Sequence, residues 1–309
     1  MDDSHKEYDV IIIGGGPAGL SAGIYTARAR LKSLLLERGA VGGQIINTEW
    51  VENYPGIESI GGIELTMMMH KQAEKFGLET VIADVTGLEV QGKDKLVRTT
   101  KSEFTAKAVI ITGGSERQKL GILGEAEYTG KGVSYCATCD GAFFRDKPVA
   151  VVGGGNAAIT EALDLAKFAS KITVIHRRDE LRATKILQEK AFAEPKIEVL
   201  WDTVIDEITG DTFVTRLKVR NVKTDKVSDL NVSGVFMAVG FKPNTDYLKG
   251  VLELDSIGAI VTGNNMETSV PGVFAAGDIR GSSIRQVIAA AGDGAIAAVN
   301  AERYISGLE

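Results

Sequence analysis

Two cysteines and an aspartate stand together near the middle of this chain, and their spacing suits redox chemistry. Cys136 and Cys139 are the only cysteines among 309 residues, and Asp140 follows the second directly. Two intervening residues is the spacing of pairs that cycle between dithiol and disulfide. The neighbouring carboxyl can act as a general acid that protonates the thiolate leaving as the dithiol forms. The alternative is that Asp140 is the N-cap of a helix that begins near Gly141, and one carboxylate could serve both purposes.

A structural role for the cysteine pair is less well supported. A closed zinc site needs four ligands, whereas the chain has no third cysteine and only three histidines, His5, His70 and His176. A disulfide between residues so close in sequence would remove little entropy from the unfolded chain. We therefore predict a catalytic redox pair and no metal site.

A glycine-rich nucleotide-binding pattern lies near the N-terminus. Residues 8–13 form a short β-branched apolar run, as a buried parallel strand does. A G-x-G-x-x-G sequence follows, then a predicted helix over 20–30 and a strand over 33–36 that ends at Glu37. The glycines permit a tight turn and close approach of a pyrophosphate, and the acid can bind a ribose hydroxyl. The predicted binding residues are Gly14, Gly16, Pro17, Ala18, Gly19 and Glu37.

A second copy of this pattern begins at residue 148. Strand 148–152 precedes a G-x-G-x-x-A sequence, a predicted helix over 159–168 and a strand over 171–175. In both copies 23 residues separate the first glycine from the end of the second strand, where Glu37 is replaced by His176 and arginines. An acid there favours a free 2′-hydroxyl, as in FAD, and arginines accommodate the 2′-phosphate of NADPH, unless they only form a solvated basic face. The predicted binding residues of this copy are Gly153, Gly155, Asn156, Ala157, His176, Arg177, Arg178 and Arg182.

Composition and charge restrict the class of protein. The length favours two domains, and 44% apolar and 25% charged residues are ordinary for a globular protein. The net charge of −6 argues against a nucleic-acid partner. The polar, acidic N-terminus is unlike a signal peptide, and no run approaches the ~18 apolar residues of a membrane span. We expect a cytoplasmic protein without a membrane partner, in which a disulfide is more often catalytic than structural.

The C-terminal part carries a third pattern. Residues 270–278 read V-P-G-V-F-A-A-G-D, and R-Q-V follows at 285–287 before a small-residue helix over 288–299. This resembles the two-nucleotide flavoprotein disulfide reductases, in which the aspartate contacts the flavin ribityl chain; on the residues alone it could be a helix N-cap. The resemblance implies flavin contacts by Gly43, Gln44, Asn53, Asp278, Arg285, Gln286 and Val287. A further predicted strand, 108–111, ends at Thr112 and Gly113, placed to touch the flavin dinucleotide.

Taken together, the motifs resemble the low-molecular-weight thioredoxin reductases over nearly the whole chain. They are Y-C-A-T-C-D-G, the two glycine patterns, H-R-R, and A-x-G-D with R-Q-V. The resemblance implies a homodimer that uses NADPH and FAD to reduce thioredoxin or a thioredoxin-like protein. It also implies that Cys139 lies nearest the flavin, that Cys136 attacks the partner disulfide, and that the nicotinamide domain rotates between two arrangements.

The expected fold class is α/β, with two doubly wound Rossmann-like dinucleotide-binding domains. The FAD domain is predicted over 1–117 and 246–309, and the inserted NADPH domain, which carries the dithiol, over 118–245. The segments 117–121 and 242–246 contain small or loop residues suited to hinges. Two alternatives remain: a flavin-dependent disulfide reductase with another electron donor, such as a ferredoxin, and a non-catalytic flavin redox sensor.

Overall fold

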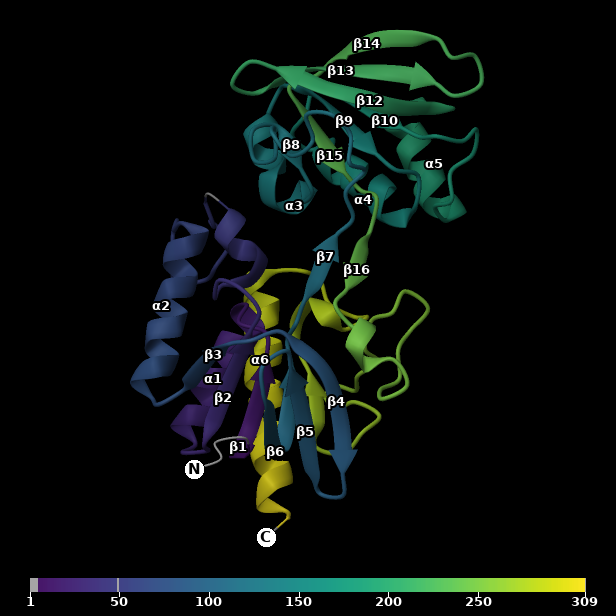
Figure 1. Cartoon of the computed structure of the whole chain (residues 1–309). Helices are drawn as coiled ribbons and strands as arrows, with labels where there is room; N and C mark the ends of the chain where they lie inside the picture. The colour runs from purple at the N-terminus through teal and green to yellow at the C-terminus, as the bar shows by residue number, and fades with distance from the viewer. Residues whose placement is uncertain (1–4, 49, 309) are drawn as a thin grey trace. The chain divides into compact units, whose positions relative to one another are not determined.

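The computed structural model describes residues 5–48 and 50–308, which form two compact units (Figure 1). Unit 1 comprises Met1–Glu116 and Lys242–Glu309, and unit 2 comprises Arg117–Phe241. The chain passes between them twice, along the paired strands β7 (Ser115–Arg117) and β16 (Phe241–Pro243). Residues 1–4, which contribute to the prediction that the chain has no signal peptide, lie outside the described residues.

Unit 1 is built on one sheet that has a parallel and an antiparallel part. The order β3-β2-β1-β6 is parallel, β17 also pairs with β6, and β5 and β4 continue the sheet antiparallel. Its strands are β1 (His5–Ile13), β2 (Ser33–Glu37), β3 (Glu79–Ile82), β4 (Val85–Gln91), β5 (Asp94–Thr99), β6 (Glu103–Ile111) and β17 (Val273–Ala275).

Both faces of the central strand β1 are buried, which explains its continuous apolar sequence. Val10 and Ile12 belong to a core with the three α-helices of this unit, while Ile11 and Ile13 belong to a second core on the opposite face. Side chains from β4, β5 and the segment 248–279 complete that second core. The helical elements are α1 (Pro17–Arg28), α2 (Gly62–Lys75), α6 (Val287–Ser306) and the 3₁₀ turns η1 (Gly43–Asn47), η3 (Asp246–Leu248) and η4 (Gly277–Ile279).

Unit 2 repeats the parallel strand–helix–strand arrangement and adds a small antiparallel sheet. The parallel sheet has the order β11-β10-β9-β15-β8, and the antiparallel sheet has the order β12-β13-β14 (Figure 1). Its strands are β8 (Val133–Ser134), β9 (Pro148–Val152), β10 (Lys171–Ile175), β11 (Ile197–Leu200), β12 (Thr203–Gly210), β13 (Val214–Asn221), β14 (Val227–Asn231) and β15 (Gly234–Met237). Its helical elements are α3 (Ala137–Asp140), η2 (Gly141–Phe144), α4 (Asn156–Leu165) and α5 (Lys185–Ala193).

The parallel sheet of unit 2 is covered on its two faces by different elements. Val149 and Val151 of β9 pack with α4 and α5, whereas Ala150 and Val152 pack against the antiparallel sheet. The alternation along one strand thus places it between a helical layer and a β layer. No described helix is long and apolar enough to cross a bilayer.

Three helices differ from the sequence prediction at their ends. Helix α1 begins at Pro17 and α4 at Asn156, each three residues earlier than predicted, because the helix starts immediately after the glycine turn. Proline suits the first helical position, where no backbone N–H is required. Helix α6 extends to Ser306 and continues through its Gly292-Asp-Gly294 segment.

Gly294 is expected to be essential for packing α6 on α1, with Gly292 as a matched control. A Cβ at Gly294 would lie 2.0 Å from the carbonyl oxygen of Ala18, whereas one at Gly292 would meet nothing within 4 Å. We predict that Gly294→Ala lowers the free energy of unfolding by about 2–3 kcal/mol through overpacking. Gly292→Ala should raise it by up to ~1 kcal/mol through helix propensity. Denaturant unfolding of both variants measures this, and equal effects would contradict the packing account.

Candidate active site

The first glycine turn closes so tightly on the end of β6 that side chains are excluded. Gly14 has φ +113°, and a Cβ there would lie 2.5 Å from the carbonyl oxygen of Thr112. A Cβ at Gly19 would lie 1.9 Å from the Gly14 oxygen. The Thr112 hydroxyl lies 2.7 Å from that same oxygen and braces the turn. Thr112 was predicted to bind the cofactor; in the structure its hydroxyl stabilises the first glycine turn.

Gly16 differs from its neighbours because no described residue fills the space beside it. The nearest atom to a Cβ there is the Gly43 Cα at 3.8 Å. Gly16 is the N-cap of α1, and no side chain caps the helix. The free N–H groups of the first turn and the helix dipole favour an anion. The local geometry therefore fits a dinucleotide pyrophosphate, with Pro17 and Ala18 in the first helical turn.

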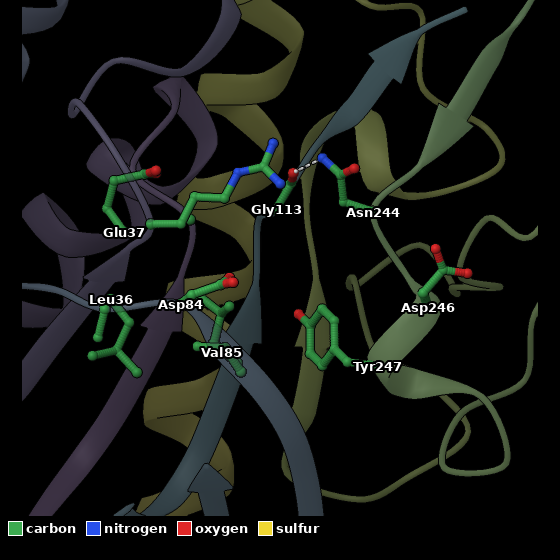
Figure 2. Close-up of a pocket in the computed structure, with 12 residues that line it drawn as sticks. Leu36, Glu37, Asp84, Val85, Gly113, Asn244, Asp246 and Tyr247 are labelled. Atoms are coloured by element: carbon green, nitrogen blue, oxygen red, sulfur yellow. Dashed lines mark hydrogen bonds between the residues drawn. The ribbon is translucent and has the colours of Figure 1, made fainter. Parts of the chain in front are cut away.

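Glu37 ends β2 and faces a cavity of about 200 Å³ in unit 1 (Figure 2). Its carboxylate accepts hydrogen bonds from the backbone N–H groups of Gly15 at 2.6 Å and Gly39 at 2.9 Å. These bonds hold the acid at the mouth of the glycine turn. A ribose bound there would meet an oriented carboxylate.

Several side chains that line this cavity come from outside the sequence motifs, among them Asp84, Asn244 and Tyr247. Asn244 donates to the carbonyl oxygen of Gly113 at 2.8 Å, and in Figure 2 the Tyr247 hydroxyl points toward Asp84. That hydroxyl is buried and has no hydrogen-bond partner among residues 5–48 and 50–308. Burial, followed by the charge of Asp84, raises the pKa of Tyr247 above its ordinary value. Asp84 lies just beyond the end of the parallel strand β3, a position in the sequence that is typical of ligand-binding residues. No feature of the sequence around Tyr247 indicates that it lines this cavity.

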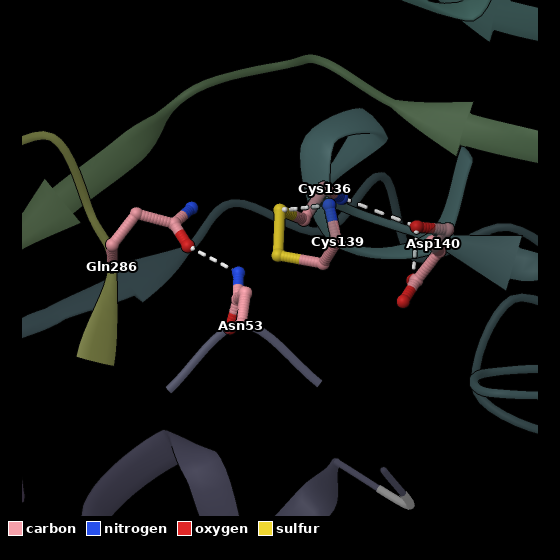
Figure 3. Close-up of a disulfide and its surroundings, with 6 residues drawn as sticks. Asn53, Cys136, Cys139, Asp140 and Gln286 are labelled. Carbon is pink, nitrogen blue, oxygen red and sulfur yellow. Dashed lines mark hydrogen bonds between the residues drawn. A yellow bond between two sulfur atoms is a disulfide. The ribbon is translucent and has the colours of Figure 1, made fainter. Parts of the chain in front are cut away.

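The structure brings several of the predicted flavin residues into contact with one another. Gly43 packs on Gly16, and the Gln44 amide donates to the Ser115 carbonyl. Asn53 donates to the Gln286 side-chain oxygen at 3.0 Å, across more than two hundred residues of sequence (Figure 3). Gln286 is the N-cap of α6, Val287 is its first residue, and Arg285 has φ +53°.

Asp278 does not cap a helix through its side chain. It lies inside η4, nine residues before α6 begins, and accepts a hydrogen bond from the Ser283 hydroxyl at 2.8 Å. The N-cap alternative is therefore wrong for this residue. Its proposed contact with a flavin stays a prediction.

A buried ion pair that the sequence motifs did not indicate supports the same turn. Arg280 donates to Asp293 of α6 at 2.6 and 3.2 Å, and the Gly277 N–H donates to the same carboxylate at 3.1 Å. The two side chains are only 13% and 12% exposed. Breaking one partner of such a buried pair leaves an uncompensated charge. The only sequence signal was a carboxylate within an otherwise small, apolar helix.

The second glycine turn, in unit 2, reproduces the first. Gly153 has φ +145°, and a Cβ there would lie 2.6 Å from the Ala238 oxygen. At Gly155, the N-cap of α4, nothing lies within 4 Å of a Cβ. Asn156 and Ala157 open the helix, and the Asn156 side-chain oxygen accepts from the Thr184 N–H at 2.8 Å. This turn also offers a cradle and uncapped N–H groups to a pyrophosphate.

The loop after β10 folds back over this turn. His176 is buried, packs over Gly154 and donates from its ring to the Glu180 carbonyl at 3.0 Å. Burial, aided by three nearby arginines, lowers the pKa of His176, so the ring is neutral at neutral pH. The Arg182 N–H donates to the Gly154 carbonyl at 2.7 Å. In the described residues no carboxylate pairs with the exposed guanidinium groups of Arg177, Arg178 and Arg182.

Glu161 is a buried carboxyl in α4 that sequence reasoning missed. Within the part of the chain that the structure describes, its Oε2 has no hydrogen-bond partner. Burial raises the pKa of Glu161 to about 7, although Arg117 opposes the shift. A buried acceptor without a partner, one turn into the helix that begins at the second glycine turn, is available to a ligand's donor group.

The cysteine pair is closed as a disulfide, with Cα atoms 5.3 Å apart (Figure 3). Cys136 is the N-cap of α3, and its sulfur accepts from the Cys139 N–H at 3.2 Å. Asp140 ends this helix and occupies the N-cap position of the following turn η2, as the alternative expected, but its side chain makes no capping hydrogen bond there. Its Oδ2 accepts instead from the Ser134 hydroxyl at 2.6 Å. Among the described residues no group of three or more His, Cys, Asp or Glu side chains could hold a metal ion.

Comparison with protein families agrees with this arrangement. Residues 8–294 match the pyridine nucleotide-disulphide oxidoreductase family. The chain is 48% identical over 305 residues to a thioredoxin reductase of Peptoclostridium acidaminophilum, covering 96% of this chain and 97% of the relative. It is 47% identical over 306 residues to that of Bacillus subtilis, covering 98% and 96%.

Comparison with solved structures leads to the same group. The crystal structure of thioredoxin reductase from Streptococcus pyogenes superposes with a TM-score of 0.94 at 48% identity, covering 97% of this chain and 99% of the other. The enzyme from Giardia duodenalis also gives 0.94, at 40% identity, with the same shares covered. The expected fold class, two Rossmann-like domains in an α/β chain, is confirmed by this likeness.

The raised pKa of Glu161 predicts a stability effect with a definite sign. The folded state holds this proton up to about pH 7, whereas the unfolded chain releases it near the ordinary value of 4.5. Stability is therefore lost as pH rises through this window. Glu161→Gln should remove this loss of unfolding free energy. The loss amounts to at most ~3 kcal/mol, because a shift of one pKa unit corresponds to about 1.4 kcal/mol. Thermal unfolding of both proteins at pH 5 and pH 8 tests it; identical pH dependences would contradict the buried, unpaired state.

Proposed function

Because the chain belongs to the pyridine nucleotide-disulphide oxidoreductase family, and within it to the thioredoxin reductases, we propose the following electron path. Electrons from NADPH would reach the Cys136–Cys139 disulfide through a bound FAD, and the resulting dithiol would reduce thioredoxin or a thioredoxin-like protein. The observation that carries the proposal is the closed C-x-x-C disulfide in the unit that also holds the second glycine turn.

We assign FAD to the domain made of residues 1–117 and 246–309. Three features of unit 1 support the assignment: the open cradle at Gly16, the uncapped N-terminus of α1, and Glu37 beside the cavity. A carboxylate suits a ribose that carries no 2′-phosphate. Tyr247, with its buried unpartnered hydroxyl, is positioned to donate to the adenosine end of such a ligand. A bound flavin supplies hydride acceptance and two-electron transfer to a disulfide.

We assign NADPH to the domain over residues 118–245. Arg177, Arg178 and Arg182 present guanidinium groups that pair with no carboxylate of the described residues, beside a loop anchored on the second glycine turn. Arginine binds phosphate through bidentate, charge-assisted hydrogen bonds. Glu161 has an unpartnered oxygen available to a donor such as the nicotinamide amide.

The two cysteines and Asp140 are assigned separate roles in the reduction of the partner. Two electrons and two protons convert the disulfide to two thiols, and Asp140 gives a proton to the sulfur that leaves as a thiolate. Cys139 would be the sulfur that faces the flavin. Cys136 would attack the partner disulfide, forming a mixed disulfide that Cys139 then resolves, so that the enzyme disulfide re-forms and thioredoxin departs as a dithiol.

We further propose a cytoplasmic homodimer. Ile63, Met67 and Met68 of α2 are each more than half exposed, whereas Met69 is buried in the core of unit 1. Large apolar side chains exposed on one helix are typical of an interface. The low cysteine count and the single, closely spaced pair fit a reducing compartment.

The electron path predicts distinct effects for flavin reduction and partner reduction. In anaerobic titration, low concentrations of NADPH should bleach the flavin of the wild type and of Cys136→Ser and Cys139→Ser. Both variants should lose reduction of thioredoxin by at least about 1,000-fold, because neither can form the dithiol. Full activity in either variant would exclude the relay. If only dithionite bleached the wild type, a ferredoxin or another donor would replace NADPH.

The nucleotide preference predicts a split between NADPH and NADH. Arg177→Ala with Arg178→Ala should raise KM for NADPH by about 10- to 100-fold, as expected from losing charge-assisted contacts worth ~1.5–3 kcal/mol. KM for NADH should change little. Steady-state kinetics with both donors measures the split, with Arg216→Ala on β13 as an exposed-arginine control. Equal losses with both donors would exclude the 2′-phosphate role.

A further inference from the structure

Ser134 joins the disulfide to its neighbouring carboxylate, although the sequence motifs assign it no role. It ends β8 and is only 5% exposed. Its hydroxyl donates to Asp140 Oδ2 at 2.6 Å and accepts the Cys136 N–H at 3.1 Å. One buried hydroxyl therefore contacts both the first cysteine and the acid that follows the second.

The direction of these two hydrogen bonds is determined by chemistry. A backbone N–H can only donate, so the Cys136 amide uses a lone pair of the Ser134 oxygen. When Asp140 is a carboxylate, its Oδ2 can only accept, so the single hydroxyl proton of Ser134 is donated to it. Of the two carboxylate oxygens, Oδ1 makes no hydrogen bond to Ser134 and is therefore the one open to take up a proton for transfer to sulfur.

Both ends of this connection are held by rigid elements. Strand β8 pairs in parallel with β15, with Ser134 opposite Phe236, which is fully buried. The Asp140 backbone N–H donates to the Cys136 carbonyl at 3.1 Å. The carboxylate is thus fixed at its backbone by the disulfide turn and at its side chain by the sheet, leaving little rotation about its side-chain bonds.

We propose that Ser134 is a positioning residue for proton transfer to and from the Cys136–Cys139 pair. The inference rests on the acid role proposed for Asp140. When a reductant breaks the S–S bond, one sulfur leaves as a thiolate and takes the proton from Asp140 Oδ1, which becomes a carboxylate and is reprotonated from solvent. Ser134 neither gains nor loses a proton; its hydrogen bond selects the oxygen and the orientation.

The test uses dithiothreitol as reductant of the purified holoprotein, so that it needs neither NADPH nor thioredoxin. Each dithiothreitol loses two electrons and closes to its cyclic disulfide as the protein disulfide opens. The rate at which the disulfide opens is measured by acid quench at successive times, alkylation of the free thiols and mass spectrometry. Ser134→Ala should slow opening about 10-fold or more, the order expected for one hydrogen bond to a charged group. Ser134→Thr, which keeps the hydroxyl, should stay within about threefold of the wild type.

A double-mutant cycle separates positioning from a general structural effect. If Ser134 acts through Asp140, adding Ser134→Ala to Asp140→Asn should slow opening no further. Three outcomes would each overturn the proposal. The first is that the two substitutions slow opening by the product of their separate effects. The others are a Ser134→Ala rate equal to that of the wild type and a Ser134→Thr rate equal to that of Ser134→Ala. Ser233→Ala, beside β15, is the control for loss of a serine hydroxyl, and thermal unfolding verifies that all variants fold.

The outcome is independent of the proposed electron donor. If NADPH fails to bleach the wild-type flavin while the dithiothreitol cycle shows coupling, the donor is wrong and the role of Ser134 stands. If NADPH bleaches the flavin and the cycle shows no coupling, the electron path stands and the positioning role is excluded.

Discussion

Both units depend on the same steric constraint, the absence of a side chain where a strand turns sharply into a helix. At Gly14 and at Gly153 the backbone has a positive φ, and a carbonyl oxygen from a neighbouring segment fills the place of a Cβ. These contacts hold the turn close against the end of a neighbouring strand. The following glycines, Gly16 and Gly155, are not crowded by protein atoms. The same motif therefore combines glycines required by packing with glycines that leave room for a ligand.

Polar groups supplied by distant segments stabilise these turns. Thr112 braces the first turn, Glu37 accepts from its backbone, and His176 covers the second turn as a neutral ring. The buried pair of Arg280 and Asp293 holds the Gly277 N–H and thereby the turn containing Asp278. Polar residues that follow parallel strands lie at one edge of the sheet, because the carboxyl ends of parallel strands are adjacent.

The dithiol has a different kind of support. Its helix has only four residues, and its position comes from β8 on one side and from hydrogen bonds around Cys136 and Asp140 on the other. The short disulfide turn is thus anchored on a buried parallel strand. This suits a pair that must change its bonding repeatedly without unfolding its surroundings.

The sequence alone determined the features that depend on local spacing. The two glycine patterns, the apolar strands before them and the contrast between Glu37 and Arg177–Arg178 are visible without coordinates, because the turn and the strand end are a constant number of residues apart. The C-x-x-C spacing likewise indicated redox chemistry. Local pattern was less reliable at helix ends: Asp140 occupies the N-cap position of η2 without a side-chain cap, and Asp278 lies inside η4 and is not an N-cap.

Only the tertiary structure decided which side chains meet across long separations. The contacts of Asn53 with Gln286 and of Arg280 with Asp293, and the cavity shared by Asp84 and Tyr247, join segments with no common motif. The burial of Glu161, which raises its pKa, depends on atoms from other elements packed around it. Ser134 is only two residues from Cys136 in the sequence. Its proposed role could nevertheless be inferred only from the direction in which its side chain points at the end of the strand. Spacing along the chain specifies backbone turns, whereas burial and hydrogen-bond direction are set by what folds against them.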